Sequence, residues 1–128
     1  MIVDTSAIVA VLRDEDDAEH FMHMLETHPG SRVSAGSWIE LGAVLSSHGG
    51  EEIHGDLQSL ADAARLVIAP VNAEQAEIGY RAYREYGRGH HRARLHFGDC
   101  FAYALAKATG EPLLFKGDDF VHTDITAA

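Results

Sequence analysis

Five acidic residues stand where this sequence passes into a helix or a turn: Asp4, Glu40, Asp99, Asp118 and Asp119. In open parallel sheets the carboxyl ends of the strands meet at one edge, and active sites gather there. Carboxylates brought together at that edge would raise one another's pKa unless a hard cation joined them. Oxygen ligands suit Mg²⁺ or Mn²⁺. The residue types and their placement therefore indicate a divalent-metal site.

Each acid also has a purely structural interpretation. Asp4, Asp99 and Asp119 could each cap a helix, because an aspartate accepts hydrogen bonds from the first backbone N–H groups. Glu40 follows Ser37 at the spacing of a capping box, which would begin a helix at position 41. Spacing alone leaves both interpretations open, and only the shared placement at one edge of the inferred sheet favours a common site.

The elements that would position these acids alternate along the chain. We expect strands at 1–3, 32–34, 66–71 and 112–115, and helices at 7–12, 14–25, 41–47, 51–65, 73–86 and 100–109. The strands are short and apolar, as expected for strands buried on both faces. The pattern predicts an α/β fold with a parallel sheet of four or five short strands sandwiched between helices. We see no repeat or linker, so we expect one domain over 1–128, with a frayed C-terminus.

The size and composition exclude several classes of protein. A chain of 128 residues with 46% hydrophobic and 23% charged residues is typical of one globular domain. The longest apolar run, at 7–12, is far shorter than the roughly 18 residues of a membrane span. The opening lacks a basic n-region, and a single cysteine excludes an internal disulfide. We therefore expect a cytoplasmic protein with no membrane association.

The charge distribution is uneven. The net charge of −10 argues against a general nucleic-acid binder. Five of the ten cations nevertheless fall between positions 81 and 94, opposed there only by Glu85: Arg81, Arg84, Arg88, Arg92 and Arg94. This cationic segment is a candidate RNA-tracking strip or simply a solvated surface. The tyrosines at 80, 83 and 86 could stack on bases or pack against the fold.

Four segments, in order, resemble one family. Residues 2–10 (IVDTSAIVA), 37–40 (SWIE), 97–106 (FGDCFAYALA) and 112–120 (PLLFKGDDF) are similar to the PIN domain, specifically to the VapC toxins of type II toxin–antitoxin modules. The resemblance extends from Ile2 to Ile125. It implies a PIN domain over 1–128.

The resemblance also implies an activity and a set of site residues. It implies a magnesium-dependent endoribonuclease in which Mn²⁺ substitutes for Mg²⁺. Asp4, Glu40 and Asp99 match the family's metal-site acids, while the shortened last turn makes Asp118 our choice for the fourth acid and Asp119 the reserve. Ser6 matches a small hydroxyl that could orient a carboxylate or a metal-bound water.

The mechanism and partners follow as hypotheses. Metal-activated water would attack the scissile phosphorus and leave a 5′-phosphate and a 3′-hydroxyl. The route uses no 2′-hydroxyl nucleophile, so RNA preference would come from substrate shape. The family implies a structured RNA such as tRNA, a cognate VapB-type antitoxin and a homodimer.

Two rival functions remain. A catalytically silent PIN fold could act only as a binding module. A receiver-type signalling domain also has an acidic pocket and a lysine after its last strand, which Lys116 could supply. However, neither the 32–34 nor the 66–71 strand ends in aspartate, which disfavours the receiver.

Overall fold

A parallel four-stranded sheet lies at the centre of the computed structural model, which describes residues 1–128. The strands are β1 (Ile2–Val3), β2 (Arg32–Ser34), β3 (Val67–Ala69) and β4 (Leu113–Leu114), in the order β3-β2-β1-β4. The helices are α1 (Thr5–Leu12), α2 (Ala18–Thr27), α3 (Ala35–His48), α4 (Glu52–Ala64), α5 (Ala73–Tyr86) and α6 (Asp99–Thr109). The expected α/β fold with a parallel sheet between helices is confirmed.

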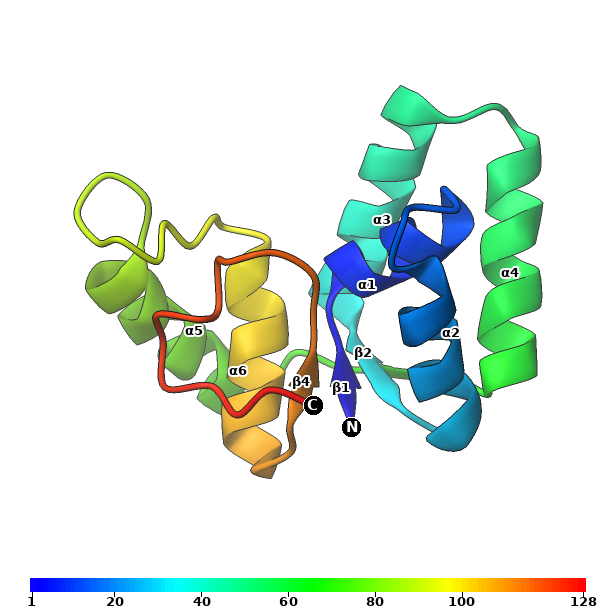
Figure 1. Cartoon of the computed structure of the whole chain (residues 1–128). Coiled ribbons are helices and arrows are strands. Elements are labelled where there is room, and N and C mark those ends of the chain that lie inside the picture. The colour runs from blue at the N-terminus through cyan, green and yellow to red at the C-terminus, as the bar shows by residue number, and fades with distance from the viewer.

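Helices cover both faces of the sheet (Figure 1). Helices α1 to α4 lie on one side, and α5 and α6 lie on the other. Successive side chains of a strand point to opposite faces, so Val3 joins the core on the α1–α4 side while its neighbour Ile2 joins the core against α6. Leu114 and Leu113 divide in the same way. Two apolar layers therefore hold even these very short strands in place.

Two local expectations are wrong. The strand β3 is not buried on both faces, because it lies at the edge of the sheet and leaves Val67 and Ile68 about half exposed. The capping box at Ser37 and Glu40 does not form, because α3 begins at Ala35 with Ser34 as its N-cap. The helix thus starts two residues before Ser37, and Glu40 does not cap it.

The segments that follow β1 and β4 lie next to each other at the carboxyl edge of the sheet. The backbone N–H of Asp4 donates to Leu114 O at 2.9 Å, so the residues that follow β1 and β4 lie side by side. The helix α6 precedes β4 and runs back along the sheet, which places its first residue, Asp99, near this same edge.

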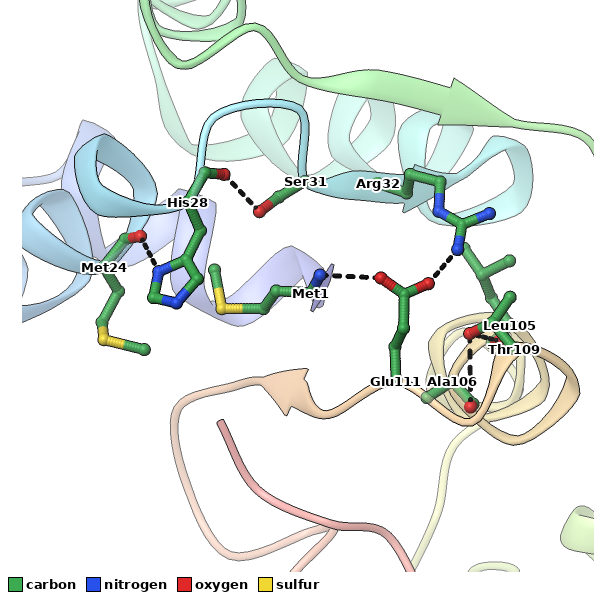
Figure 2. A network of polar contacts seen from close by, with 9 residues as sticks. All are labelled: Met1, Met24, His28, Ser31, Arg32, Leu105, Ala106, Thr109 and Glu111. Atoms are coloured by element: carbon green, nitrogen blue, oxygen red, sulfur yellow. Dashed lines mark hydrogen bonds and ion pairs between the residues drawn. The ribbon is translucent and has the colours of Figure 1, made fainter.

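The amino edge carries a different arrangement of charges. Figure 2 shows Glu111, in the connection before β4, between the amino group of Met1 and the guanidinium of Arg32. The distance from Met1 N to Glu111 Oε1 is 2.8 Å. These ion pairs join the starts of β1 and β2 to the segment that leads into β4. None of the six helices has the length and apolar character that a membrane crossing requires.

Candidate active site at the carboxyl edge

Asp4 is the most deeply buried acid of the site. It caps α1, and its Oδ2 accepts hydrogen bonds from Ser6 N at 3.0 Å and from Ser6 Oγ at 2.6 Å. Only 4% of Asp4 is exposed. Burial, with a smaller contribution from the charge of Asp99, raises the pKa of Asp4 to about 6 against the lowering effect of these hydrogen bonds. The structural and functional interpretations of Asp4 are thus both compatible with its geometry.

Glu40 approaches Asp4 from α3. Its Oε2 accepts a hydrogen bond from Thr5 Oγ1 at 3.3 Å. Burial raises the pKa of Glu40, and the charge of Asp4 adds to the effect. Gly98 makes room for this carboxylate, because a Cβ at position 98 would lie 2.4 Å from both Glu40 oxygens. The side chain of Glu40 therefore fits against bare backbone at the start of α6.

Asp99 is the first residue of α6, and its carboxylate lies close enough to Asp4 for its charge to affect the pKa of Asp4. The Oδ2 of Asp99 accepts a hydrogen bond from the backbone N–H of His96, three residues earlier, at 2.8 Å. The ring nitrogen Nδ1 of His96 lies 3.3 Å from the same oxygen. Burial raises the pKa of Asp99, and the charge of Asp119 contributes to the rise.

The last turn brings Asp119, rather than Asp118, to these acids. A carboxylate oxygen of Asp119 lies within 4.8 Å of ligand atoms of Asp99 and His96. Asp118 is exposed and lies outside this group, and the more buried Asp4 and Glu40 also lie outside it. Gly117 adopts φ +93° and Phe120 is buried against Phe115, so the turn is held in an orientation that directs Asp119 inward. The geometry favours the reserve residue as the fourth acid.

Ser6 links two of these segments. Besides donating to Asp4, its Oγ accepts the backbone N–H of Lys116 at 2.9 Å. The hydroxyl therefore has a fixed orientation: its own hydrogen points at the carboxylate. Ser6 orients Asp4, as the sequence suggested that it could.

The donor set fits a divalent cation. Asp4, Glu40, Asp99 and Asp119 have no lysine or arginine nitrogen within ion-pair distance. The nearby Lys116 instead contacts Glu15 and Asp17. Buried acids are normally paired with a cation or bound to a metal. The Glu40 carboxylate lies against Gly98 with no positively charged partner. Oxygen-rich, negatively charged sites of this kind suit Mg²⁺ or Mn²⁺.

The cationic segment lies on the surface beyond α6. All five of its arginines are exposed. The Arg84 guanidinium lies 6.0 Å from the centre of the Tyr80 ring, beside an apolar groove of about 460 Å³ between α5 and α6. Tyr80 and Tyr83 line this groove and are exposed, whereas Tyr86 packs against Tyr103. The two exposed rings are available for stacking, and the third belongs to the fold.

The sequence profile of the PIN domain family matches residues 1–125. The chain belongs to the PIN domain family. Its curated relatives place it in the VapC branch. Ribonuclease VapC42 of Mycobacterium tuberculosis is 49% identical over 129 residues, which cover 100% of this chain and 98% of the relative. Ribonuclease VapC30 of the same species is 46% identical over 98% of this chain and 95% of its own length.

Solved structures share the fold at low sequence identity. The crystal structure of VapC20 of Mycobacterium tuberculosis, described as a sarcin–ricin loop cleaving toxin, superposes with a TM-score of 0.79 at 15% identity, covering 99% of this chain and 97% of that one. A toxin–antitoxin complex from Klebsiella pneumoniae has a TM-score of 0.71 at 16% identity, covering 99% and 95%. Membership of the PIN family removes the receiver-type alternative. In agreement, Lys116 contacts Glu15 and Asp17 rather than the strand-end acid.

Sequence reasoning missed three residues at the site. Thr5 orients Glu40, Gly98 leaves the space for it, and His96 contacts Asp99. The only signal in the sequence was the position of His96 three residues before the candidate ligand Asp99. The roles of Thr5 and Gly98 depend on where Glu40 arrives in three dimensions, and no local pattern contains that information.

Proposed function

We propose that this protein is the toxin of a type II toxin–antitoxin module and a divalent-metal-dependent endoribonuclease. The observation that carries the proposal is a continuous series of neighbouring acids from four separate segments, with no lysine or arginine paired to any of them. Asp4 lies near both Glu40 and Asp99, and Asp99 lies near Asp119. Asp4, Glu40, Asp99 and Asp119 would hold Mg²⁺, with Mn²⁺ as a substitute. The names of the VapC relatives support the ribonuclease assignment.

The bound ion would supply Lewis acidity that activates water and offsets the charge of the phosphoryl group. Ser6 and Thr5 orient Asp4 and Glu40 toward the shared space. Burial makes the Glu40 carboxylate a stronger base than an exposed glutamate. Glu40 would accept the proton of the attacking water as the new O–P bond forms. The bond from phosphorus to the 3′-oxygen would break, and the 3′-oxygen would take up a proton, which leaves a 5′-phosphate and a 3′-hydroxyl.

The substrate class is RNA with a defined shape, such as tRNA. The cationic segment supports this proposal, because its arginines cluster on one exposed stretch of a chain that is otherwise acidic. Phosphate contacts from this strip would offset the repulsion between RNA and the acidic protein. The exposed rings of Tyr80 and Tyr83 offer stacking surfaces beside it.

A VapB-type antitoxin and a second copy of the chain are the proposed protein partners. Similarity to a toxin chain from a toxin–antitoxin complex supports the first. A groove between α1, α2 and α4, lined in part by Met22, Glu26 and Asp56, suits an amphipathic segment with basic residues. Sedimentation of the purified chain, alone and with its antitoxin, tests both partners.

RNA cleavage by the purified protein tests the activity. We expect structured RNA to be cut in the presence of Mg²⁺ or Mn²⁺ and to remain intact in EDTA, with 5′-phosphate ends on the products. Asp4→Asn or Asp99→Asn should reduce cleavage by at least about 100-fold, the scale of loss for a misassembled site, while the circular dichroism spectrum stays unchanged.

Adjacent acids provide a matched control. Asp119→Asn should reduce cleavage as strongly as Asp99→Asn, whereas Asp118→Asn should change it less than about threefold, as expected for a surface substitution. Intact RNA in the presence of Mg²⁺ or Mn²⁺ would favour the silent binding module. Cleavage in EDTA, or full activity in both Asp4→Asn and Asp99→Asn, would instead overturn the proposed metal site.

A further inference from the structure

His96 adds a nitrogen to the otherwise oxygen-only donor set at the carboxyl edge. One ligand atom from each of His96, Asp99 and Asp119 lies within 4.8 Å of the other two. The His96 side chain is about half exposed, so its ring can still turn toward the shared space. We propose that His96 is a nitrogen ligand of the divalent ion and shifts the preference of the site from Mg²⁺ toward Mn²⁺. The inference rests on the metal site of the proposed function.

The backbone places the imidazole beside Asp99. The His96 N–H donates to Asp99 Oδ2 at 2.8 Å and fixes residue 96 at the start of α6. The ring itself is held less firmly, because the 3.3 Å between its Nδ1 and Asp99 Oδ2 exceeds the usual N–H···O range of about 2.7–3.2 Å. The ring is therefore close to the carboxylate without depending on it as a hydrogen-bond partner.

The spacing of the three side chains suits a common ion. Ligand distances of about 2.1 Å in an octahedral site place two ligands of one ion about 3.0–4.2 Å apart. The atoms of His96, Asp99 and Asp119 lie within 4.8 Å of one another, so small side-chain rotations bring all three into range. Neither aspartate contacts a lysine or arginine that would oppose this closure.

Charge favours imidazole over a further carboxylate at this position. Burial and mutual repulsion already raise the pKa of Asp4, Glu40 and Asp99. A neutral imidazole adds a donor without adding negative charge. Imidazole binds the later divalent metals more readily than it binds Mg²⁺, which prefers oxygen. Loss of His96 should consequently weaken Mn²⁺ binding more than Mg²⁺ binding.

A purely orienting role for His96 makes a different prediction. If the ring only donated a hydrogen bond to Asp99, His96→Asn would retain a donor and most of the metal affinity. If the ring is a ligand, the same variant loses the nitrogen. His23→Asn is the matched control, since His23 is an exposed histidine on α2 outside the cluster.

Pulsed electron paramagnetic resonance of the Mn²⁺-loaded full chain tests the inference. We expect a ¹⁴N coupling to Mn²⁺ that persists in His23→Asn and disappears in His96→Asn. The Kd for Mn²⁺ should rise about tenfold in His96→Asn, a typical effect of losing a metal-site partner, and the Kd for Mg²⁺ should rise by less than about threefold.

Four outcomes decide between this inference and the proposed function. Mn²⁺ binding without a nitrogen coupling, or with equal losses of Mn²⁺ and Mg²⁺ affinity in His96→Asn, overturns the ligand role and leaves the ribonuclease assignment intact. Failure of the wild-type chain to bind Mn²⁺ overturns it as well. Undiminished RNA cleavage in Asp99→Asn overturns the proposed function independently.

Discussion

The two edges of the same sheet place carboxylates in opposite electrostatic surroundings. At the amino edge, Glu111 contacts both Arg32 and the Met1 amino group. At the carboxyl edge, Asp4, Glu40 and Asp99 have raised pKa values and no lysine or arginine partner. The ion pairs of Glu111 connect the starts of β1 and β2 to the segment before β4. The acids at the carboxyl edge leave negative charge uncompensated inside the fold, which costs stability and is expected where a cation binds.

The largest effect is expected when the Glu40 carboxylate is displaced from the carboxyl edge. Gly98→Ala puts a Cβ 2.4 Å from both oxygens of the Glu40 carboxylate, so the carboxylate must move. Gly98 has an ordinary helical φ of −60°, and alanine there should not disturb the backbone. We expect RNA cleavage to fall about 100-fold, as for a displacement of about 1 Å at a reacting centre, measured as initial rate at saturating Mg²⁺.

Gly42→Ala is the control for that experiment. Gly42 lies on α3, and a Cβ there meets nothing within 4 Å. This variant should keep full activity and gain about 0.5–1 kcal/mol of stability from helix propensity. Equal activity in the two variants would mean that the position of Glu40 is unimportant.

The second test measures the free-energy cost of the buried acid in EDTA. The pKa of Asp4 is about 6 in the folded state and 3.8 in the unfolded reference. The folded state therefore binds this proton more tightly, and Asp4 opposes folding most at a pH above 6. Asp4→Asn should then be more stable than wild type by up to about 3 kcal/mol at pH 8, at 1.36 kcal/mol per pKa unit.

The pH dependence of the stability difference between Asp4→Asn and wild type shows whether the charge of Asp4 causes it. As the pH falls through 6 toward 4, Asp4 becomes protonated in the folded chain, and the stability difference should shrink toward zero. Urea unfolding of both proteins at pH 8, 6 and 4 gives the values. A difference that is constant with pH would assign it to packing or capping rather than to charge.

The smallest effect is expected at the amino edge. Arg32→Gln removes an ion pair whose partners are both partly exposed, and such pairs contribute about 1 kcal/mol or less. We expect a loss of that size in urea unfolding, weaker at high salt, with metal affinity and RNA cleavage unchanged. A loss of activity equal to that of Gly98→Ala would show that the two edges are coupled.

The sequence was a better guide to which segments form the site than to how their side chains are oriented. Asp4 and Asp99 could be placed because each adjoins a helix start next to a recognisable strand or alanine-rich helix. The sequence led us to choose Asp118 over Asp119, but which of the two carboxylates turns inward depends on the positive φ of Gly117 and the burial of Phe120. Periodicity reports which residues are apolar, not the direction in which a four-residue turn points.

Two further misses have tertiary causes. The local Ser37–Glu40 pattern suggested a helix start, but Ser34 caps α3 and the Ser37 hydroxyl is buried without a hydrogen-bond partner. The expected fraying of the last residues is also wrong. Ala127 bridges Leu113, and the backbone N–H of Ala128 donates to Leu113 O at 2.9 Å. A contact between residues 15 positions apart (128 − 113) leaves no trace in local composition.

The hydrogen bond from Lys116 N to Ser6 Oγ joins residues 110 positions apart. It forms only once β4 has added to β1, and the same event carries the Asp119 turn toward Asp99. A chain that lacks residues 113–128 therefore lacks both the Asp119 carboxylate beside Asp99 and the backbone N–H that holds the Ser6 hydroxyl. Removal of β4 and the turn after it should thus take away one acid of the site and a contact that orients another.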